Sequence, residues 1–442
     1  MVGRLNIAID EETSRLLSSR ERLWEPSFRQ LVFSLVSEVS YNKAPFFTNA
    51  FLLRELDELK SRTLEDAVNR TGRQITEFRD DLRGRILAEY GFNPETGELE
   101  DSSKLPESVT APNPEHSEAD LSEFAERIAT KVKEYNETHE TRIKMPVSDV
   151  IDSLEVVPED AVVVCIDEVG VKHQKEYRKE TRKEEAQKEM TKEEIKLENA
   201  ENVETAVAYI RSSEGAYRIA EKTVTLALLT TLAYLLKNNL LANRKLLFFT
   251  DGARNLKASI EKVFSFCPYT INLDWIHVKS YCYQLLTMAL KGGKDNLERN
   301  EKLRNGFFAY LWVGDVQGAK DYLDTIDHAY IKNAGMIQSV KNYLDRKSED
   351  ENQKYFYCYQ MRKELELINS SNQGEKSNDM IIAHRQKHNG MSWVVDGSAN
   401  LGHICELQVN HEEETWYKTG QLKFAPVKLT DQIIQNYHYQ AA

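Results

Sequence analysis

The chain has 442 residues, of which 41% are hydrophobic and 29% charged, and its formal net charge is −13. This length and hydrophobic content allow two or three folded domains, since a domain averages roughly 150 residues. The negative charge excludes a protein that coats nucleic acid with its whole surface, because phosphate binding needs Lys and Arg to displace counterions. Any contact with DNA must therefore be local.

Neither membrane insertion nor secretion is expected. The longest apolar stretch, residues 224–236, is broken by threonines and falls below the roughly 20 residues that a membrane span needs. The N-terminal sequence carries an acidic cluster where a secretory signal would carry an apolar run, so we expect a cytosolic protein. The cysteines have no CxxC or Cys/His spacing suited to zinc. Reduced, mostly structural thiols are predicted at Cys165, Cys267, Cys282, Cys358 and Cys405.

Residues 1–150 are predicted to form a mainly helical N-terminal region. Apolar side chains recur at intervals of three and four residues through 28–39 and 51–68, as they do on one face of a helix. The segment 63–87 resembles a helix-turn-helix with Gly72 at its turn, which would bind DNA ends. A plain pair of amphipathic helices is the alternative, because the would-be recognition helix is acidic at Glu77, Asp80 and Asp81.

Two further segments complete this region. Residues 93–117 are rich in Pro, Ser, Glu and Asp, which predicts a linker or an exposed loop. A helix is expected over 121–137, ahead of the first strong strand.

Residues 151–277 are predicted to form the first part of an α/β core. A strand at 161–171 precedes a run of mixed charges at 174–201, for which a solvated insertion is the simplest interpretation. Paired antiparallel strands are expected next. The predicted elements that follow the charged run are strands at 203–210 and 216–221, a buried helix at 223–238, a strand at 245–250, a helix at 253–264 and a strand at 269–273.

The rest of the chain is mainly helical in pattern. Residues 278–367 are predicted to be a helical insertion, after which the core resumes at 368–400 with a helix over 375–388. Residues 401–442 form a C-terminal tail. This order of elements is the plan of an RNase H-like mixed α/β sheet with a large helical insertion, preceded by a mainly helical N-terminal region.

Two aspartates stand near the ends of strands in this plan. Asp167 interrupts the apolar strand 161–171, where a buried carboxylate is costly unless it is paired or bound to metal. Asp251 directly follows the strand 245–250. Open α/β sheets bind ligands at the carboxyl ends of their strands, so the two side chains are expected at one edge. The ordinary alternatives are a strand-end residue at Asp167 and a helix N-cap at Asp251.

A third carboxylate, Glu375, lies on the returning helix. Phosphoryl transfer on DNA needs positive charge beside the attacking and leaving oxygens, and two Mg²⁺ ions about 3.5–4 Å apart supply it. Such ions take carboxylate oxygens as ligands. We therefore predict two Mg²⁺ ions, replaceable by Mn²⁺, with Asp167 bridging them and Asp251 and Glu375 each binding one. Asp379, one helical turn on, is the alternative to Glu375.

Four segments resemble blocks of bacterial insertion-sequence transposases of the DDE class, especially the ISKra-like group. They are CIDEVGVKHQKE (165–176), LFFTDGARNL (247–256), INLDWIH (271–277) and 369–393, which ends in GMSW. The resemblance spans most of residues 160–400 and assigns the catalytic acids, by position, to Asp167, Asp251 and Glu375.

The resemblance also implies that a DWxH block lies near the catalytic site. It is similar to a signature of hAT- and Mutator-like transposases. Asp274 would be a fourth acid near the metals, and His277 would orient a carboxylate or contact the scissile strand. The alternative is structural: Trp275 fills core and His277 satisfies a buried hydrogen bond.

Basic residues cluster in sequence around these elements and would position phosphates, although each alone could be a solvated side chain. They are Arg254, Lys257, Lys279, Lys376, Arg385 and Lys387.

The resemblance implies a transposase that binds the ends of its element and joins them to target double-stranded DNA. A homodimer is expected, since two ends are handled together, in the bacterial cytosol at the nucleoid. The alternatives are another RNase H-fold nuclease or resolvase, and a domesticated, inactive DNA-binding protein. Many relatives carry a cysteine-rich zinc-binding sequence near the N-terminus, whereas this chain has no cysteine before Cys165. Trp416 matches the family's C-terminal anchor.

Overall fold

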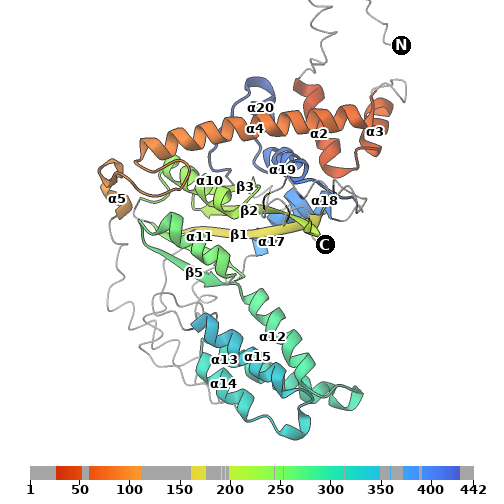
Figure 1. Cartoon of the computed structure of the whole chain (residues 1–442), viewed down its shortest axis with the longest axis vertical. Helices are drawn as coiled ribbons and strands as arrows, with labels where there is room; N and C mark the ends of the chain where they lie inside the picture. Colours follow the sequence, from red (N-terminus) through yellow and green to blue (C-terminus); the bar gives the residue numbers. More distant parts are fainter. Residues whose placement is uncertain are drawn as a thin grey trace, which may run out of the picture.

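The computed structural model describes residues 26–51, 59–110, 161–175, 191, 195, 199–242, 244–251, 253–312, 314–348, 359, 372–387 and 391–428. In Figure 1 the long helix α4 (Ser61–Glu89) runs across one side of a central β-sheet. On the opposite side α12 (Trp275–Ala289) leads away from the sheet to a separate group of helices.

The sheet is mixed and has five strands in the order β3-β2-β1-β4-β5. β1 is antiparallel to β2 and parallel to β4, β2 is antiparallel to β3, and β4 is parallel to β5. This topology is compatible with the RNase H-like arrangement predicted from the sequence. The strands are β1 (Ala161–Lys172), β2 (Asn202–Ser212), β3 (Gly215–Glu221), β4 (Lys245–Thr250) and β5 (Tyr269–Leu273).

Both faces of β1 are covered, which explains its nearly continuous run of Val and Ile. Successive side chains of a strand point to opposite faces. Val162 and Val164 pack in one core with α10 (Val224–Lys237), and Val169 packs in a second core with α19 (Val395–Val409). A central strand that is buried on both faces needs such an apolar sequence, so the strand prediction is confirmed.

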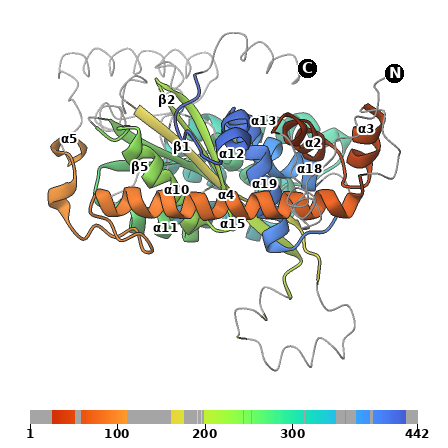
Figure 2. The same ribbon diagram turned by 90° about the horizontal axis from the view of Figure 1, so that it is seen from above.

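Most of the described residues before Tyr90 lie in helices. The longest of these helices, α4, runs unbroken through 63–87, so the predicted helix-turn-helix is wrong. Gly72 permits a close approach between helices instead of a turn: a Cβ there would lie 2.4 Å from the Cβ of Asn400 on α19. Figure 2 shows α4 as one straight helix that runs across the molecule. The two helices before it are α2 (Pro26–Glu38) and α3 (Lys43–Phe51).

A buried ionic cluster, defined as Arg79, Glu221, His403 and Glu406, attaches α4 to β3 and α19. Arg79 lies 2.7 Å from Glu406 (Nη1 to Oε1) and 3.2 Å from Glu221 (Nε to Oε1), and it also contacts His403. Burial opposes ionisation of Glu406, but Arg79 and His403 hold the pKa of that carboxyl below its usual range. Burial, reinforced by Arg79, lowers the pKa of His403. Arg83 Nη1 also lies 3.7 Å from Glu221 Oε1, so the two buried carboxylates face two arginines of the protein itself.

The beginning of the predicted linker is an ordered loop. Phe92 is buried and forms a β-bridge with Leu99, and Asn93 Oδ1 accepts from the backbone N–H groups of Glu95 and Thr96. The short helices η1 (Ser102–Lys104) and α5 (Glu107–Thr110) follow. Residues 111–117, the helix predicted at 121–137 and most of the charged run 174–201 lie outside the described residues.

The described part of the predicted insertion is mainly helical, with short connections such as the β-bridge between Leu290 and Ile331. Its first helix, α12, begins at Trp275, earlier than expected, because Asp274 caps it. The preceding helix α11 (Arg254–Phe264) belongs to the core. The remaining elements are η3 (Lys294–Asn296), α13 (Leu297–Trp312), α14 (Val316–Asp324), η4 (His328–Tyr330) and α15 (Ala334–Ser348).

The returning helix is a composite of three segments. They are α17 (Asn372–Asn378), the π-helical segment η5 (Asp379–Ala383) and α18 (His384–Gln386). α20 (Glu413–Thr419) follows α19 and buries Trp416 edge-on against Phe78 of α4, with ring centroids 5.9 Å apart. The tail is thus anchored as the sequence predicted, while residues 429–442 lie outside the described part.

The thiols fit the prediction of structural cysteines where they are described. Burial raises the pKa of Cys165, Cys267, Cys282 and Cys405 to about 12, and all four are free thiols. Cys358 lies outside the described residues. Within the described ranges, no helix combines the length and apolar character required to cross a bilayer.

Candidate active site

The two aspartates are brought together by adjacent parallel strands. The ladder between β1 and β4 ends at the pair Cys165 and Phe249, two residues before each aspartate. β4 stops at Thr250, but β1 continues to Lys172, paired only with β2. Asp167 therefore lies within its strand and not at its end, at the point where the neighbouring strand gives way to Asp251.

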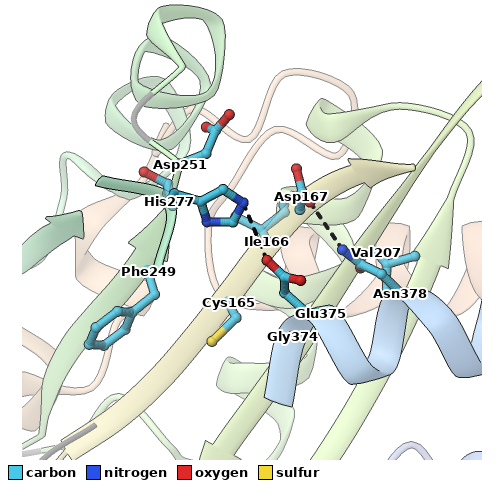
Figure 3. A pocket seen from close by; sticks show the side chains of 11 residues that line it. Cys165, Ile166, Asp167, Val207, Phe249, Asp251, His277, Gly374, Glu375 and Asn378 are labelled. Atoms are coloured by element: carbon cyan, nitrogen blue, oxygen red, sulfur yellow. Dashed lines mark hydrogen bonds and ion pairs between the residues drawn. The ribbon is translucent and has the colours of Figure 1, made fainter. Parts of the chain in front are cut away.

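Glu375 reaches the same place from α17. Asp167, Asp251 and Glu375 all line one pocket at this edge of the sheet, although they come from three separate parts of the chain (Figure 3). The other lining residues are Cys165, Ile166, Val207, Phe249, Thr250, His277, Gly374 and Asn378. The convergence predicted from the sequence is thus observed.

The carboxylate of Asp167 is held at both oxygens. Its Oδ1 accepts the backbone N–H of Glu168 at 2.8 Å, and its Oδ2 accepts the side-chain amide of Asn378 at 3.0 Å. Burial is the main cause that raises the pKa of Asp167 above its ordinary value; the carboxylates of Asp251 and Glu375 raise it further, while the N–H of Glu168 and the imidazole of His277 oppose the rise. The side chain is therefore a partly buried charge facing like charges, which favours a nearby cation.

Asp251 is exposed, and its carboxylate shapes the turn after β4. Its Oδ1 accepts the backbone N–H of Ala253 at 2.8 Å, whereas the N-cap of α11 is Ala253 itself, without a side-chain cap. The ordinary alternative for Asp251, a helix N-cap, therefore does not apply. Asp251 lines the pocket together with Asp167 and Glu375.

His277 lies between two acids. Its Nε2 is 3.3 Å from Glu375 Oε1, and its Nδ1 is 3.5 Å from Asp274 Oδ1, at the outer limit of a hydrogen bond. Asp274, and to a lesser degree Glu375 and Asp167, raise the pKa of His277 to about 9. The imidazole is therefore a cation at neutral pH, and Glu375 is its partner (Figure 3).

The predicted DWxH block divides into different roles. Asp274 is fully buried, caps α12 by accepting the N–H of His277 at 3.0 Å, and does not line the pocket. Asp274 is therefore not in the position expected for a fourth acid beside the metals. Its carboxylate lies next to His277 Nδ1 and outside the lining of the pocket. Trp275 packs against Phe308, Trp312 and Tyr359, as the structural alternative predicted. Only His277 reaches the pocket.

The acids offer the oxygen ligands that Mg²⁺ prefers, but they are not gathered around one point as they stand. Among the residues that the structure describes, no three His, Cys, Asp or Glu side chains are grouped closely enough to hold an ion. Glu375 is directed to His277 instead. Metal binding would require Glu375 to leave this histidine and turn towards Asp167 and Asp251.

The alternative to Glu375 does not reach the pocket. Asp379 is exposed at the start of η5, whereas Asn378 lies beside Asp167. Positions 378 and 379 both lie about one helical turn from Glu375, and it is Asn378 that the fold directs into the pocket. Sequence reasoning overlooked Asn378 because it searched this helix for charged ligands only.

The predicted DNA contacts are distributed among the helices beside the pocket. Lys257, Lys279 and Lys376 lie on α11, α12 and α17, the helices that carry or follow the pocket residues, and Lys387 is exposed after α18. Arg254 begins α11, and its side chain is outside the described part of the structure.

Arg385 is a correction to this set. Its side chain is fully buried, donates from Nε to the carbonyl of Val36 at 2.8 Å, and lies over the rings of Tyr41 and Trp393. Because α18 turns this residue into the core against α2, it cannot contact DNA. Its predicted role is wrong.

Comparisons with known proteins do not assign the chain to a family. No family model matches it, and no curated protein matches it. Among solved structures, the Drosophila P element transposase strand transfer complex is 10% identical to it, over 75% of this chain and 87% of that chain, with a TM-score of 0.19. A TM-score this low supports no conclusion about fold or function. The functional proposal therefore rests on the geometry of the pocket.

Proposed function

We propose that this protein is a DNA transposase of the DDE class, encoded by a bacterial insertion sequence. It would bind the ends of its element, cut a phosphodiester bond at each end and join the ends to target DNA. One observation supports the proposal above all: Asp167, Asp251 and Glu375, far apart in the sequence, line one pocket at the edge of a mixed sheet.

The residues of the pocket divide the work of holding two Mg²⁺ or Mn²⁺ ions. Asp167, which is fixed at both oxygens, would bridge the ions, while Asp251 and Glu375 would each bind one. The ions would supply the positive charge beside the attacking and leaving oxygens. His277 would hold Glu375 until Glu375 leaves the histidine to bind a metal ion.

Binding of DNA would rely on local positive charge, because the whole chain is acidic. Lys257, Lys279, Lys376 and Lys387 are the residues proposed to position phosphates on either side of the pocket. A homodimer would bring two element ends together.

A second candidate function is a DNA-binding protein that keeps the fold but has lost catalysis. The pairing of Glu375 with His277, which leaves the acids ungrouped, is the observation that favours it. A nuclease that cuts without joining is a further alternative, and detection of strand-transfer products in a reaction with two DNAs separates it from a transposase.

The test uses duplex DNA carrying inverted repeats found beside the coding sequence, incubated with Mg²⁺ or Mn²⁺. We expect end cleavage by the wild type and a loss of at least about a thousandfold in Asp167→Asn and Asp251→Asn, because metal assistance contributes several kcal/mol and each 1.36 kcal/mol is tenfold in rate. Asp379→Asn is the matched control, since this acid lies on the adjoining turn outside the pocket.

Two results would overturn the proposal. One is cleavage that persists in both pocket variants, which would mean that the cut is made elsewhere. The other is DNA binding by the wild type without cleavage in either metal, which is the behaviour of the inactive alternative.

A further inference from the structure

Asn378 is an uncharged side chain among the acids of the pocket. It is the last residue of α17, three positions after Glu375, so both side chains project from the same face of the helix. Figure 3 shows both directed from α17 towards β1. One short helix therefore delivers a carboxylate and an amide to the same place.

The amide holds Asp167 in a defined orientation. Because an ionised carboxylate can only accept hydrogen bonds, the amide nitrogen must face it, and Nδ2 donates to Oδ2 at 3.0 Å. The backbone N–H of Glu168 donates to Oδ1 at 2.8 Å. With one donor on each oxygen, rotation of the carboxylate is restricted while lone pairs remain available on the side of the pocket.

The position of Asn378 is fixed by packing behind it. η5 begins at the next residue, and its Ile381 and Ile382 are fully buried. α19 approaches this segment so closely that a Cβ at Gly402 would lie 3.0 Å from Ile382 Cδ1. The π-helical segment thus changes the phase of the helix, so that Asn378 faces the pocket while the following residues enter the core; such segments recur at functional sites.

An uncharged donor suits a site that must accept cations. A Lys or Arg at this position would neutralise Asp167 and compete with a metal, as Arg79 does for Glu406 in the buried ionic cluster. An Asp would add another like charge. An amide orders the carboxylate and leaves its charge in place.

We propose that Asn378 is a positioning residue that orients the carboxylate of Asp167 for metal binding. The proposal rests on the proposed function of the pocket. It extends that function by a residue that touches neither the metal nor DNA and acts through Asp167.

The experiment compares the full-length wild type with Asn378→Leu, which keeps the branched shape of the side chain and removes the donor. Gln373→Leu, an exposed position on the same helix, is the matched control. The direct readout is Mn²⁺ binding, measured by calorimetry without DNA, and the second is DNA cleavage as a function of Mg²⁺ concentration. Thermal melting establishes that each variant is folded.

We expect Asn378→Leu to bind Mn²⁺ about 10–100-fold more weakly than the wild type, the usual effect of removing a residue that orients a metal ligand. The Mg²⁺ concentration for half-maximal cleavage should rise by a similar factor, and excess Mg²⁺ should restore most of the rate. Asn378→Gln, which keeps a donor on a longer arm, should lose less, and Gln373→Leu should match the wild type. If Asn378→Leu does not fold, Asn378→Ala replaces it with the same expectation.

The outcomes separate this inference from the proposed function. If the wild type binds Mn²⁺ and cuts DNA, and the Asn378 variants bind the metal equally well, the inference alone is overturned. A loss of rate that excess Mg²⁺ does not restore, with unchanged Mn²⁺ binding, also overturns it. If the wild type neither binds Mn²⁺ nor cuts, the proposed function fails and the inference fails with it.

Discussion

The pocket at the sheet edge and the buried ionic cluster contain the same kinds of acid but treat them in opposite ways. In the buried ionic cluster, Arg79 contacts Glu221 and Glu406 within a dry interior. In the pocket, Asp167 and Asp251 both line the wall, and no arginine is among the lining residues. Each place also has a histidine, His403 in one and His277 in the other.

The directions of the pKa shifts follow from this difference. Despite burial, Arg79 and His403 lower the pKa of Glu406, whereas burial and neighbouring acids raise the pKa of Asp167. Burial and then Arg79 lower the pKa of His403, whereas Asp274 above all raises the pKa of His277. The fold thus pairs the buried carboxylates with arginine, whereas in the pocket His277 is paired with Glu375, and Asp167 and Asp251 are proposed to bind a cation from outside.

The largest effect is expected from removing the internal cation. Arg79→Leu would leave Glu221 and Glu406 buried without it, and breaking a buried ion pair on one side costs about 3–5 kcal/mol. Urea denaturation measures the loss. Arg85→Leu is the control on the same helix, because its pair with Asp81 is exposed and such pairs contribute about 0–1 kcal/mol. Equal stability of the two variants would remove the contrast on which the comparison depends.

The next effect is stabilisation of the pocket by metal. A ligand that binds only the folded state at 100 times its dissociation constant stabilises it by about 2.7 kcal/mol. We expect saturating Mg²⁺ to raise the melting temperature of the wild type and of Asp379→Asn, and to have little effect on Asp251→Asn. A Mg²⁺ response that survives in Asp251→Asn would mean that the ion binds elsewhere.

A smaller effect of opposite sign is expected at Asp167. Replacing a partly buried carboxylate that faces like charges removes a penalty, so Asp167→Asn should be more stable than the wild type by about 0.5–2 kcal/mol at pH 7 without metal. The folded state raises the pKa of Asp167. The penalty therefore disappears as the pH falls below that pKa and the Asp167 carboxyl of the wild type is protonated. Melting curves at pH 7 and at acidic pH measure the gain. An Asp167→Asn variant that is clearly less stable at pH 7 would contradict this account.

The smallest effect is a shift in the pKa of His277. NMR of the His277 ring should give a midpoint near pH 9, because Asp274 stabilises the imidazolium. A raised folded pKa means that the stabilisation is present below about pH 6.5 and is lost as the pH rises through about 9. Asp274→Asn should move the midpoint back towards 6.5, and Asp379→Asn should not change it. A wild-type midpoint near 6.5 would show that Asp274 does not act on the ring.

Much of this organisation follows from sequence patterns. The strands and the helix at 223–238 are apolar runs of distinct length and period, so their places could be predicted, and with them the meeting of Asp167 and Asp251. Gly72 misled because a glycine needed for helix contact looks the same as a glycine in a turn. Arg385 misled because nothing near it in the sequence reveals that its partners, Val36 and Tyr41, lie in α2 and just after it. Partners that are distant in sequence leave no local signal.

The contact of Asn378 with Asp167 and the pairing of His277 with Glu375 also join residues that are distant in the sequence. The i+3 spacing from Glu375 could have indicated that Asn378 shares its face, but the hydrogen bond to Asp167 depends on how α17 sits over β1. The pairing likewise depends on α12 and α17 meeting at one edge of the sheet. Such details require the three-dimensional arrangement.

The most direct test is the crystal structure of the protein with Mn²⁺, using anomalous scattering to locate the metal. The account predicts manganese in the pocket bonded to the carboxylates of Asp167 and Asp251, with Glu375 turned away from His277 to complete the site. Crystals with the pocket free of manganese at saturating concentration, or with Glu375 still on His277 and the metal bound elsewhere, would contradict it.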